Sequence, residues 1–251
     1  MPIEFEAPKP ITNAQYMLKT VGEEMMRSKS RYFDENEHEI PWDYIEFMHT
    51  AMKAMGVGSL APKEKPSPSP SPEGRGDGGE GGNGKRPPIA YQVLASQIEA
   101  LAWGDVGFYL VTPGGGLGAA AVQAAGTPEQ RAKFLARFGE EKPTFAAMCM
   151  TEAGAGSDTA SIRTRAILDE KTNEWILNGE KIFVTGGDKS FTEYEKLGKG
   201  FIVVWASIDP SAGRAGMRAF VVEAGTPGVK VRERSPDPLW AAASEIDVHR
   251  A

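Results

Sequence analysis

Residues 148–158 hold the side chains whose types and spacing are best suited to chemistry in this sequence. Met148 and Met150 flank Cys149, so on a strand both methionines share one face, where soft, unbranched thioethers suit packing against an aromatic surface. The run Gly154-Ala-Gly-Ser157 follows, and its small residues let the backbone approach a ligand and present N–H groups to a phosphate. The alternative is an ordinary tight loop, because a lone glycine run is more often that than a phosphate cradle.

A second segment, Lys181-Ile-Phe-Val-Thr-Gly-Gly187, follows at the distance expected of a β-hairpin. In this order and spacing, the two segments resemble the two flavin-facing segments of the acyl-CoA dehydrogenase family. The family patterns are Thr-Glu-Pro-Gly-Ala-Gly-Ser-Asp and Lys-x-Trp-Ile-Thr-Asn-Gly. Phe183 stands here where the family usually has tryptophan, which keeps an aromatic wall but loses the indole N–H.

The resemblance implies FAD as the cofactor and a set of residues that contact it. The implied set is Met148, Met150, Thr151, Gly156, Ser157, Phe183, Val184 and Thr185. Thr185 would lie near the flavin N5, Thr151 would donate to the pyrimidine edge, and Phe183 would shield the ring. Ser157 would lie near the pyrophosphate and also beside the pantetheine of an acyl-CoA substrate. For Phe183 and Val184 the alternative is packing in the core of a β-barrel, since residues on a strand alternate between its faces.

The implied reaction is the α,β-dehydrogenation of an acyl-CoA thioester, as in fatty acid metabolism. That reaction needs a base for the α-proton and a flavin to accept the β-hydride. In the family the base lies on a C-terminal helical bundle, which would begin about where this sequence ends, so no catalytic residue is assigned here. We expect Glu152 to be structural. The implied partners are acyl-CoA and an electron-transfer flavoprotein or similar acceptor, with a homo- or hetero-oligomer as the assembly.

A second class of function remains open. The chain would then be a non-catalytic partner subunit of a full-length dehydrogenase, or a truncated relic of one. The expected lack of the base favours this alternative, as does an unusual insert at residues 63–86. Oxidases and nitroalkane-oxidising relatives share the same motifs and also remain open.

Composition excludes several other classes. The chain has 251 residues, 41% apolar and 25% charged, which describes an ordinary globular protein. Its net charge of −6 argues against nucleic acid or an anionic membrane as the main partner. The single cysteine excludes an internal disulfide, and we expect it to be a small apolar filler. We expect no bound metal. The sequence lacks an apolar run of membrane-spanning length and a signal-peptide pattern, so we expect a cytoplasmic protein.

The first part of the chain has helical periodicity, from about Thr12 to Ala61 and again from Ala90. Gly126-Thr-Pro128 reads as a helix stop, an N-cap and a proline at the first position of the next helix. The small residues of 119–125 suggest close packing between two helices. Residues 63–86 hold a Ser-Pro repeat and a glycine-rich run, a composition typical of disorder. We favour a neutral surface insertion there over a proline-rich docking motif.

After Pro143 the pattern changes to strands. Strands are predicted at 144–150, 161–168, 175–184, 201–207, 218–223 and 229–232. Asn178-Gly179 is a strong hairpin-turn signal within the third of these segments. The prediction is an α+β protein, with an N-terminal all-α domain at 1–142 followed by an antiparallel β-barrel domain at 143–251 that binds the flavin.

Overall fold

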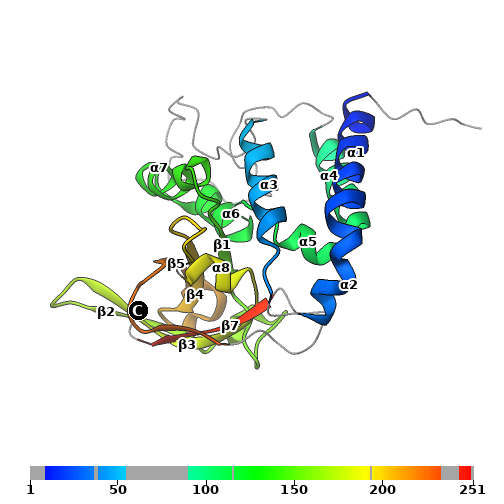
Figure 1. The fold of residues 1–251 in the computed structure, drawn as a ribbon. Coiled ribbons are helices and arrows are strands. Elements are labelled where there is room, and N and C mark those ends of the chain that lie inside the picture. Colours follow the sequence, from blue (N-terminus) through cyan, green and yellow to red (C-terminus); the bar gives the residue numbers. More distant parts are fainter. Residues whose placement is uncertain are drawn as a thin grey trace, which may run out of the picture.

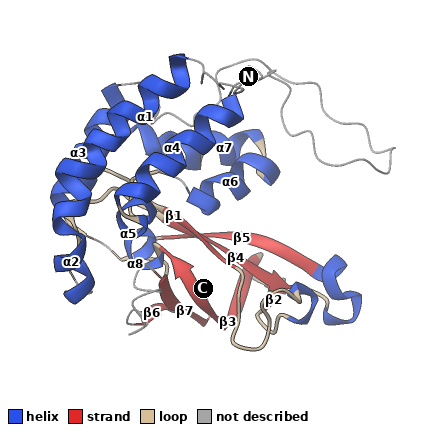
Figure 2. Ribbon diagram, turned by 90° about the vertical axis from the view of Figure 1, so that its right-hand side faces the viewer, coloured by secondary structure: helices blue, strands red, loops and turns tan. Residues whose placement is uncertain are grey.

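The computed structural model describes residues 9–36, 39–54, 90–114, 116–192, 194–232 and 243–249. Predictions for the insert at 63–86 lie outside these ranges. The helices gather on one side of the molecule and the strands on the other (Figures 1 and 2). No helix in the described part of the chain has the length and apolar character needed to span a membrane.

The helical side is built from the elements of the first part of the chain. In chain order these are α1 (Lys9–Val21), the π-helical turn η1 (Gly22–Arg27), α2 (Ser28–Glu35), α3 (Trp42–Ala54), α4 (Ala90–Gly104), α5 (Val106–Leu110), α6 (Gly116–Ala125), α7 (Pro128–Leu135) and the 3-10 turn η2 (Ala136–Gly139). The predicted cap of α7 is confirmed: Thr127 Oγ1 accepts from Gln130 N–H, and the Gln130 side chain accepts from Thr127 N–H. Gly22 and Gly104 let η1 and α4 cross closely, because a Cβ on Gly104 would lie 2.8 Å from the Gly22 Cα.

The strands form one seven-stranded sheet. They are β1 (Ala146–Cys149), β2 (Arg165–Asp169), β3 (Glu174–Thr185), β4 (Phe201–Ser207), β5 (Met217–Glu223), β6 (Val229–Arg232) and β7 (Ala243–His249). Two 3-10 turns, η3 (Thr159–Ser161) and η4 (Pro210–Gly216), and the short helix α8 (Gly187–Phe191) lie between them in sequence. The order is β1-β4-β2-β3-β7-β6, with β5 paired to the other edge of β4.

The α+β class is confirmed, but the predicted antiparallel barrel is wrong in two respects. β1 pairs with β4 in parallel, with Ala146 opposite Phe201, so the sheet is mixed. Among the described residues, no pairing joins β5 to β6 to close the strand order. The prediction came from the strand pattern and from the resemblance to the family's middle domain, and a strand pattern does not specify how strands far apart in sequence pair. A long connection, such as residues 150–200 between β1 and β4, permits a parallel pair.

The predicted hairpin turn at Asn178-Gly179 is also wrong. Both residues lie inside β3, which runs unbroken for 12 residues. The chain instead turns at residues 170–173, where Asp169 Oδ1 accepts from Lys171 N–H and Asn173 takes a positive φ of 56°. Gly179 is needed for packing, because a Cβ there would lie 2.3 Å from Thr164 Oγ1.

Helices α6 and α7 cover one face of β1 and β4. Their shared core holds Ala119, Val122, Phe134, Leu135 and Phe138 from the helical side, with Ala146, Phe201 and Val203 from the strands. The small residues of α6 therefore serve a helix–strand contact as well as a helix–helix one. Gly118 makes it possible, because a Cβ there would lie 2.7 Å from the Ala146 carbonyl carbon. This packing fixes β1, and with it the segment that follows at residue 150.

Candidate flavin-binding surface

The end of β1 places the two methionines as the alternation predicts. Met148 and Met150 are half-buried, whereas Cys149 between them has no exposed surface and lies in the sheet core. Burial raises the pKa of the Cys149 thiol to about 12, although the nearby Lys181 charge opposes the shift. Cys149 is therefore a core residue and not a nucleophile, while the methionines keep part of one face accessible.

The glycine-rich bend after β1 is packed against the protein at Ala155, whereas there is free space beside Gly154 and Gly156. Ala155 is 3% exposed, packs with Ile162 and Met217, and exchanges backbone hydrogen bonds of 3.0 and 3.1 Å with Glu152. A Cβ built on Gly154 or Gly156 would meet nothing within 4 Å. These two glycines are thus not required by packing within the described chain. Their open faces would let another molecule approach the backbone closely.

A buried lysine joins the bend to β3. Lys181 has no exposed surface, and its Nζ donates to Met150 O at 3.0 Å and to Glu152 Oε1 at 2.8 Å. The Glu152 carboxylate also accepts from Arg163 N–H at 2.6 Å, and from Thr164 N–H and Oγ1 at 3.0 and 2.6 Å. Four donor groups therefore surround one carboxylate. Their hydrogen bonds connect the segment after β1, the residues just before β2 and the middle of β3.

This network decides the ionisation of Glu152. Burial by itself would raise the pKa of Glu152, but the hydrogen bonds from Lys181, Thr164 and Arg163 outweigh burial and lower it. The carboxylate is therefore charged at neutral pH and fully engaged. A group held in this way is a poor proton acceptor, and the expectation that Glu152 is structural agrees with its contacts.

The second segment lies directly beside the first. Ile182 N–H donates to Thr151 O at 2.9 Å. At the next residue the register between β3 and β7 shifts, and Phe183 takes a positive φ of 56°, uncommon for a bulky side chain. Phe183 is 48% exposed, Thr185 is exposed, and Val184 between them is 1% exposed. Of the two barrel-core alternatives, Val184 does pack in the core, whereas Phe183 points outward.

Comparison with known proteins bears on this pair of segments. Residues 147–239 match the family model described as the acyl-CoA dehydrogenase middle domain. Over this range the chain is similar to the middle domain of acyl-CoA dehydrogenases. The matched range contains both β1 with its glycine bend and the Lys181 segment.

Curated relatives agree with this assignment over a limited length. Cyclohex-1-ene-1-carbonyl-CoA dehydrogenase of Syntrophus aciditrophicus (strain SB) is 41% identical over 104 residues, which is 41% of this chain and 22% of that protein. Acryloyl-CoA reductase (NADH) of Anaerotignum propionicum is 41% identical over 113 residues, which is 44% of this chain and 26% of that protein. The matches thus span about a quarter of the length of these relatives.

The fold extends the likeness across the chain. Butyryl-CoA dehydrogenase from Megasphaera elsdenii superimposes with a TM-score of 0.72 at 22% identity, over 99% of this chain and 58% of that one. An acyl-CoA dehydrogenase from Geobacillus kaustophilus gives a TM-score of 0.69 at 21% identity. At such identities the likeness establishes the fold alone, and it includes the helical part that the family model leaves unmatched.

The acyl-CoA dehydrogenase segments come together as the sequence suggested, but one residue that organises them was missed. Of the predicted site residues, Gly156, Ser157, Phe183 and Thr185 are exposed, Met148, Met150 and Thr151 are half-buried, and Val184 is buried in the core. Lys181 opens the second motif, yet sequence reasoning gave it no role. A lysine within an apolar strand was the available signal, because a buried charge requires a partner. Within the described ranges, no three potential metal ligands come together.

Proposed function

We propose that this chain provides the flavin-facing surface of an FAD-dependent acyl-CoA dehydrogenase. The observation that carries the proposal is the junction of the two segments, where Thr151 O accepts from Ile182 N–H and Lys181 holds the Met150 carbonyl. Around that junction lie an aromatic ring and a hydroxyl exposed on one strand, and two open glycines on the adjacent bend. We also propose the division into a helical domain at 1–142 and a middle domain at 143–251.

The described residues fit the parts of FAD that the family resemblance assigns to them. Phe183 offers an exposed aromatic face for the ring, beside the hydroxyl of Thr185. Met148 and Met150 offer partly accessible thioethers, and Thr151 a hydroxyl and N–H for the pyrimidine edge. The open bend at Gly156 and Ser157 suits a pyrophosphate. Val184 would contribute through its backbone, because its side chain is buried.

When bound, FAD would supply the hydride acceptor for the oxidation of an acyl-CoA thioester. The chain's own residues would bind and orient the two molecules and exclude water from one face of the ring. We assign no catalytic base, since Glu152 is occupied by Lys181 and by its other donors. Ser157 would also lie along the pantetheine of the substrate.

The remaining parts of the proposal rest on the family alone. They are an electron-transfer flavoprotein or similar acceptor as the redox partner, assembly as a homo- or hetero-oligomer, a role in fatty acid metabolism and a cytoplasmic location.

Flavin stoichiometry tests the proposal most directly. The purified chain would be incubated with excess FAD, separated from free flavin, and its bound flavin measured by visible absorption. We expect near-stoichiometric FAD, and an affinity about tenfold weaker in Phe183→Ala through loss of the aromatic wall. Phe47→Ala is the matched control, because Phe47 is similarly exposed at 43% but lies on α3.

Equal losses in the two variants, or no flavin bound by the wild-type chain, would contradict the proposed surface. The bound flavin would then be tested for bleaching by butyryl-CoA under anaerobic conditions. Binding without bleaching would favour the second candidate, a non-catalytic partner subunit. The occupied state of Glu152 is the observation that supports this candidate.

A further inference from the structure

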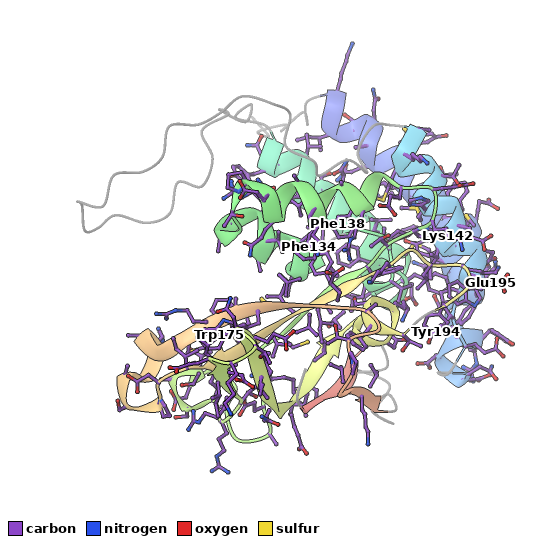
Figure 3. All side chains as sticks on the ribbon, turned by 90° about the vertical axis from the view of Figure 1, so that its left-hand side faces the viewer. Phe134, Phe138, Lys142, Trp175, Tyr194 and Glu195 are labelled. Carbon is purple, nitrogen blue, oxygen red and sulfur yellow. The ribbon has the colours of Figure 1, made fainter. Side chains whose placement is uncertain are left out.

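A second concave surface lies away from the flavin-facing segments, between α6 and α7 on one side and the sheet on the other. It is a cleft of about 540 Å³ that wraps around β5, the strand whose only described neighbour is β4. Its walls include Phe134 from α7, Phe220 from β5 and Trp175 from β3. Figure 3 shows Phe134 on the helical side and Trp175 on the sheet side of this opening. None of the residues assigned to the flavin surface lines it.

The cleft walls are mostly apolar and partly exposed. Trp175 is 40% exposed and packs on Phe220 with the ring centroids 5.3 Å apart. Helix α6 ends at Ala125, which lines the cleft with a small, exposed side chain. A volume of this size with apolar and aromatic walls is typical of a small-molecule site.

Beside one end of the cleft lies an ionic cluster with a surplus of positive charge. Glu223 lines the cleft, and its carboxylate receives Lys133 Nζ at 2.6 Å, the Arg137 guanidinium, and Lys199 Nζ at 3.7 Å. Hydrogen bonds from Lys133 and Arg137 lower the pKa of Glu223 to about 2. Three cations thus share one carboxylate, and the lysine side chains are 57% and 60% exposed.

These features together define one kind of ligand. The apolar walls favour an alkyl chain or a ring, and the surplus charge at Lys133 and Lys199 favours an anionic oxygen group at one end. We propose that the cleft between α6, α7 and β5 binds an amphipathic carboxylate, with its apolar part between Phe134 and Trp175 and its carboxylate at the two lysines. The site is separate from the proposed flavin surface.

Octanoate is a suitable probe, with 1-octanol as its uncharged counterpart of equal chain length. Binding to the full chain would be measured by calorimetry and by the fluorescence of Trp175, using Trp175→Phe to identify its signal. We expect octanoate to bind at least about tenfold more tightly than 1-octanol, because Lys133 and Lys199 both lie beside Glu223 at one end of the cleft. We expect Lys133→Gln to weaken octanoate by up to about fivefold, because the lysine is solvent-exposed.

Ala125→Phe fills the cleft without changing its charge, and we expect it to weaken both probes by at least about tenfold. Lys196→Gln is the charge control: this lysine is also exposed and pairs with Glu46 on α3, and its replacement should leave binding unchanged. Equal affinities for octanoate and 1-octanol would overturn the assignment of the ionic end. Unchanged octanoate binding in a folded Ala125→Phe variant would overturn the cleft itself.

Discussion

The buried ion pair of Lys181 and Glu152 gives the most informative test of how the two segments are held. Lys181→Met keeps the length of the side chain but removes the charge and both hydrogen bonds of Nζ. Glu152 would then lie with 9% of its side chain exposed and its charge compensated only by the Thr164 hydroxyl and two backbone N–H groups. Removing one partner of a buried pair costs about 3–5 kcal/mol.

We expect a loss near the lower limit, about 3 kcal/mol, because three donors to Glu152 remain. For a chain of this size that corresponds to a fall in Tm of about 6–12 °C. Urea unfolding followed by circular dichroism gives the free energy at pH 7. Lys196→Met is the matched control, since its pair with Glu46 is half-exposed on both sides and is worth less than about 1 kcal/mol.

The pH dependence gives a second readout of the same variant. In the wild-type chain the folded pKa of Glu152 is lowered, so its contribution to stability is present above the unfolded value of about 4.3 and is lost as pH falls through the folded value. Without Lys181, burial should raise the folded pKa, and protonation then relieves the cost at acid pH. The gap between variant and wild type should narrow from pH 7 to pH 4. A gap below 1 kcal/mol at pH 7, or one that widens on acidification, would refute the reasoning.

Three further variants or measurements test single positions. Gly179→Ala should lower the unfolding free energy by about 1–3 kcal/mol, because the new Cβ would collide with Thr164. Gly154→Ala should change it by less than about 0.5 kcal/mol, because a Cβ there has free space around it. Comparable losses in the two variants would contradict the packing account. Phe183→Gly should stabilise the flavin-free chain by up to about 1 kcal/mol through relief of its positive φ while weakening FAD, and a destabilised apo chain would show that the phenylalanine packs favourably. Cys149, with no exposed surface and a pKa of about 12, should react with a thiol reagent at pH 8 only as fast as the chain unfolds, and rapid reaction of the native chain would contradict its burial.

Features governed by neighbouring residues could be predicted from the sequence. The bounds of β4 and β6, the cap at Thr127 and the outward face of Met148 and Met150 follow from periodicity, turn chemistry and capping. These features depend on residues only a few positions apart, so contacts with distant parts of the chain do not change them. The two motifs proposed to face the flavin could be recognised for the same reason, since each is a short continuous segment.

Features that depend on residues far apart in sequence could not be predicted in this way. Asn178-Gly179 carries a hairpin signal, but Thr164, just before β2, packs against Gly179, and the turn forms elsewhere. The parallel pairing of β1 with β4 depends on the long excursion between them. The charge surplus around Glu223 joins an α7 lysine with a residue 90 positions away.

The sequence by itself determined the α+β class and the resemblance of two short segments to those of acyl-CoA dehydrogenases, because both depend on local residue types and their spacing. Only the tertiary structure decided that Lys181 pairs with Glu152, that Phe183 points outward while Val184 is buried, and that an apolar cleft ends at Glu223, which three cations share. Burial and electrostatic pairing depend on distances in space, and the fold sets those distances through contacts between residues that no local pattern connects.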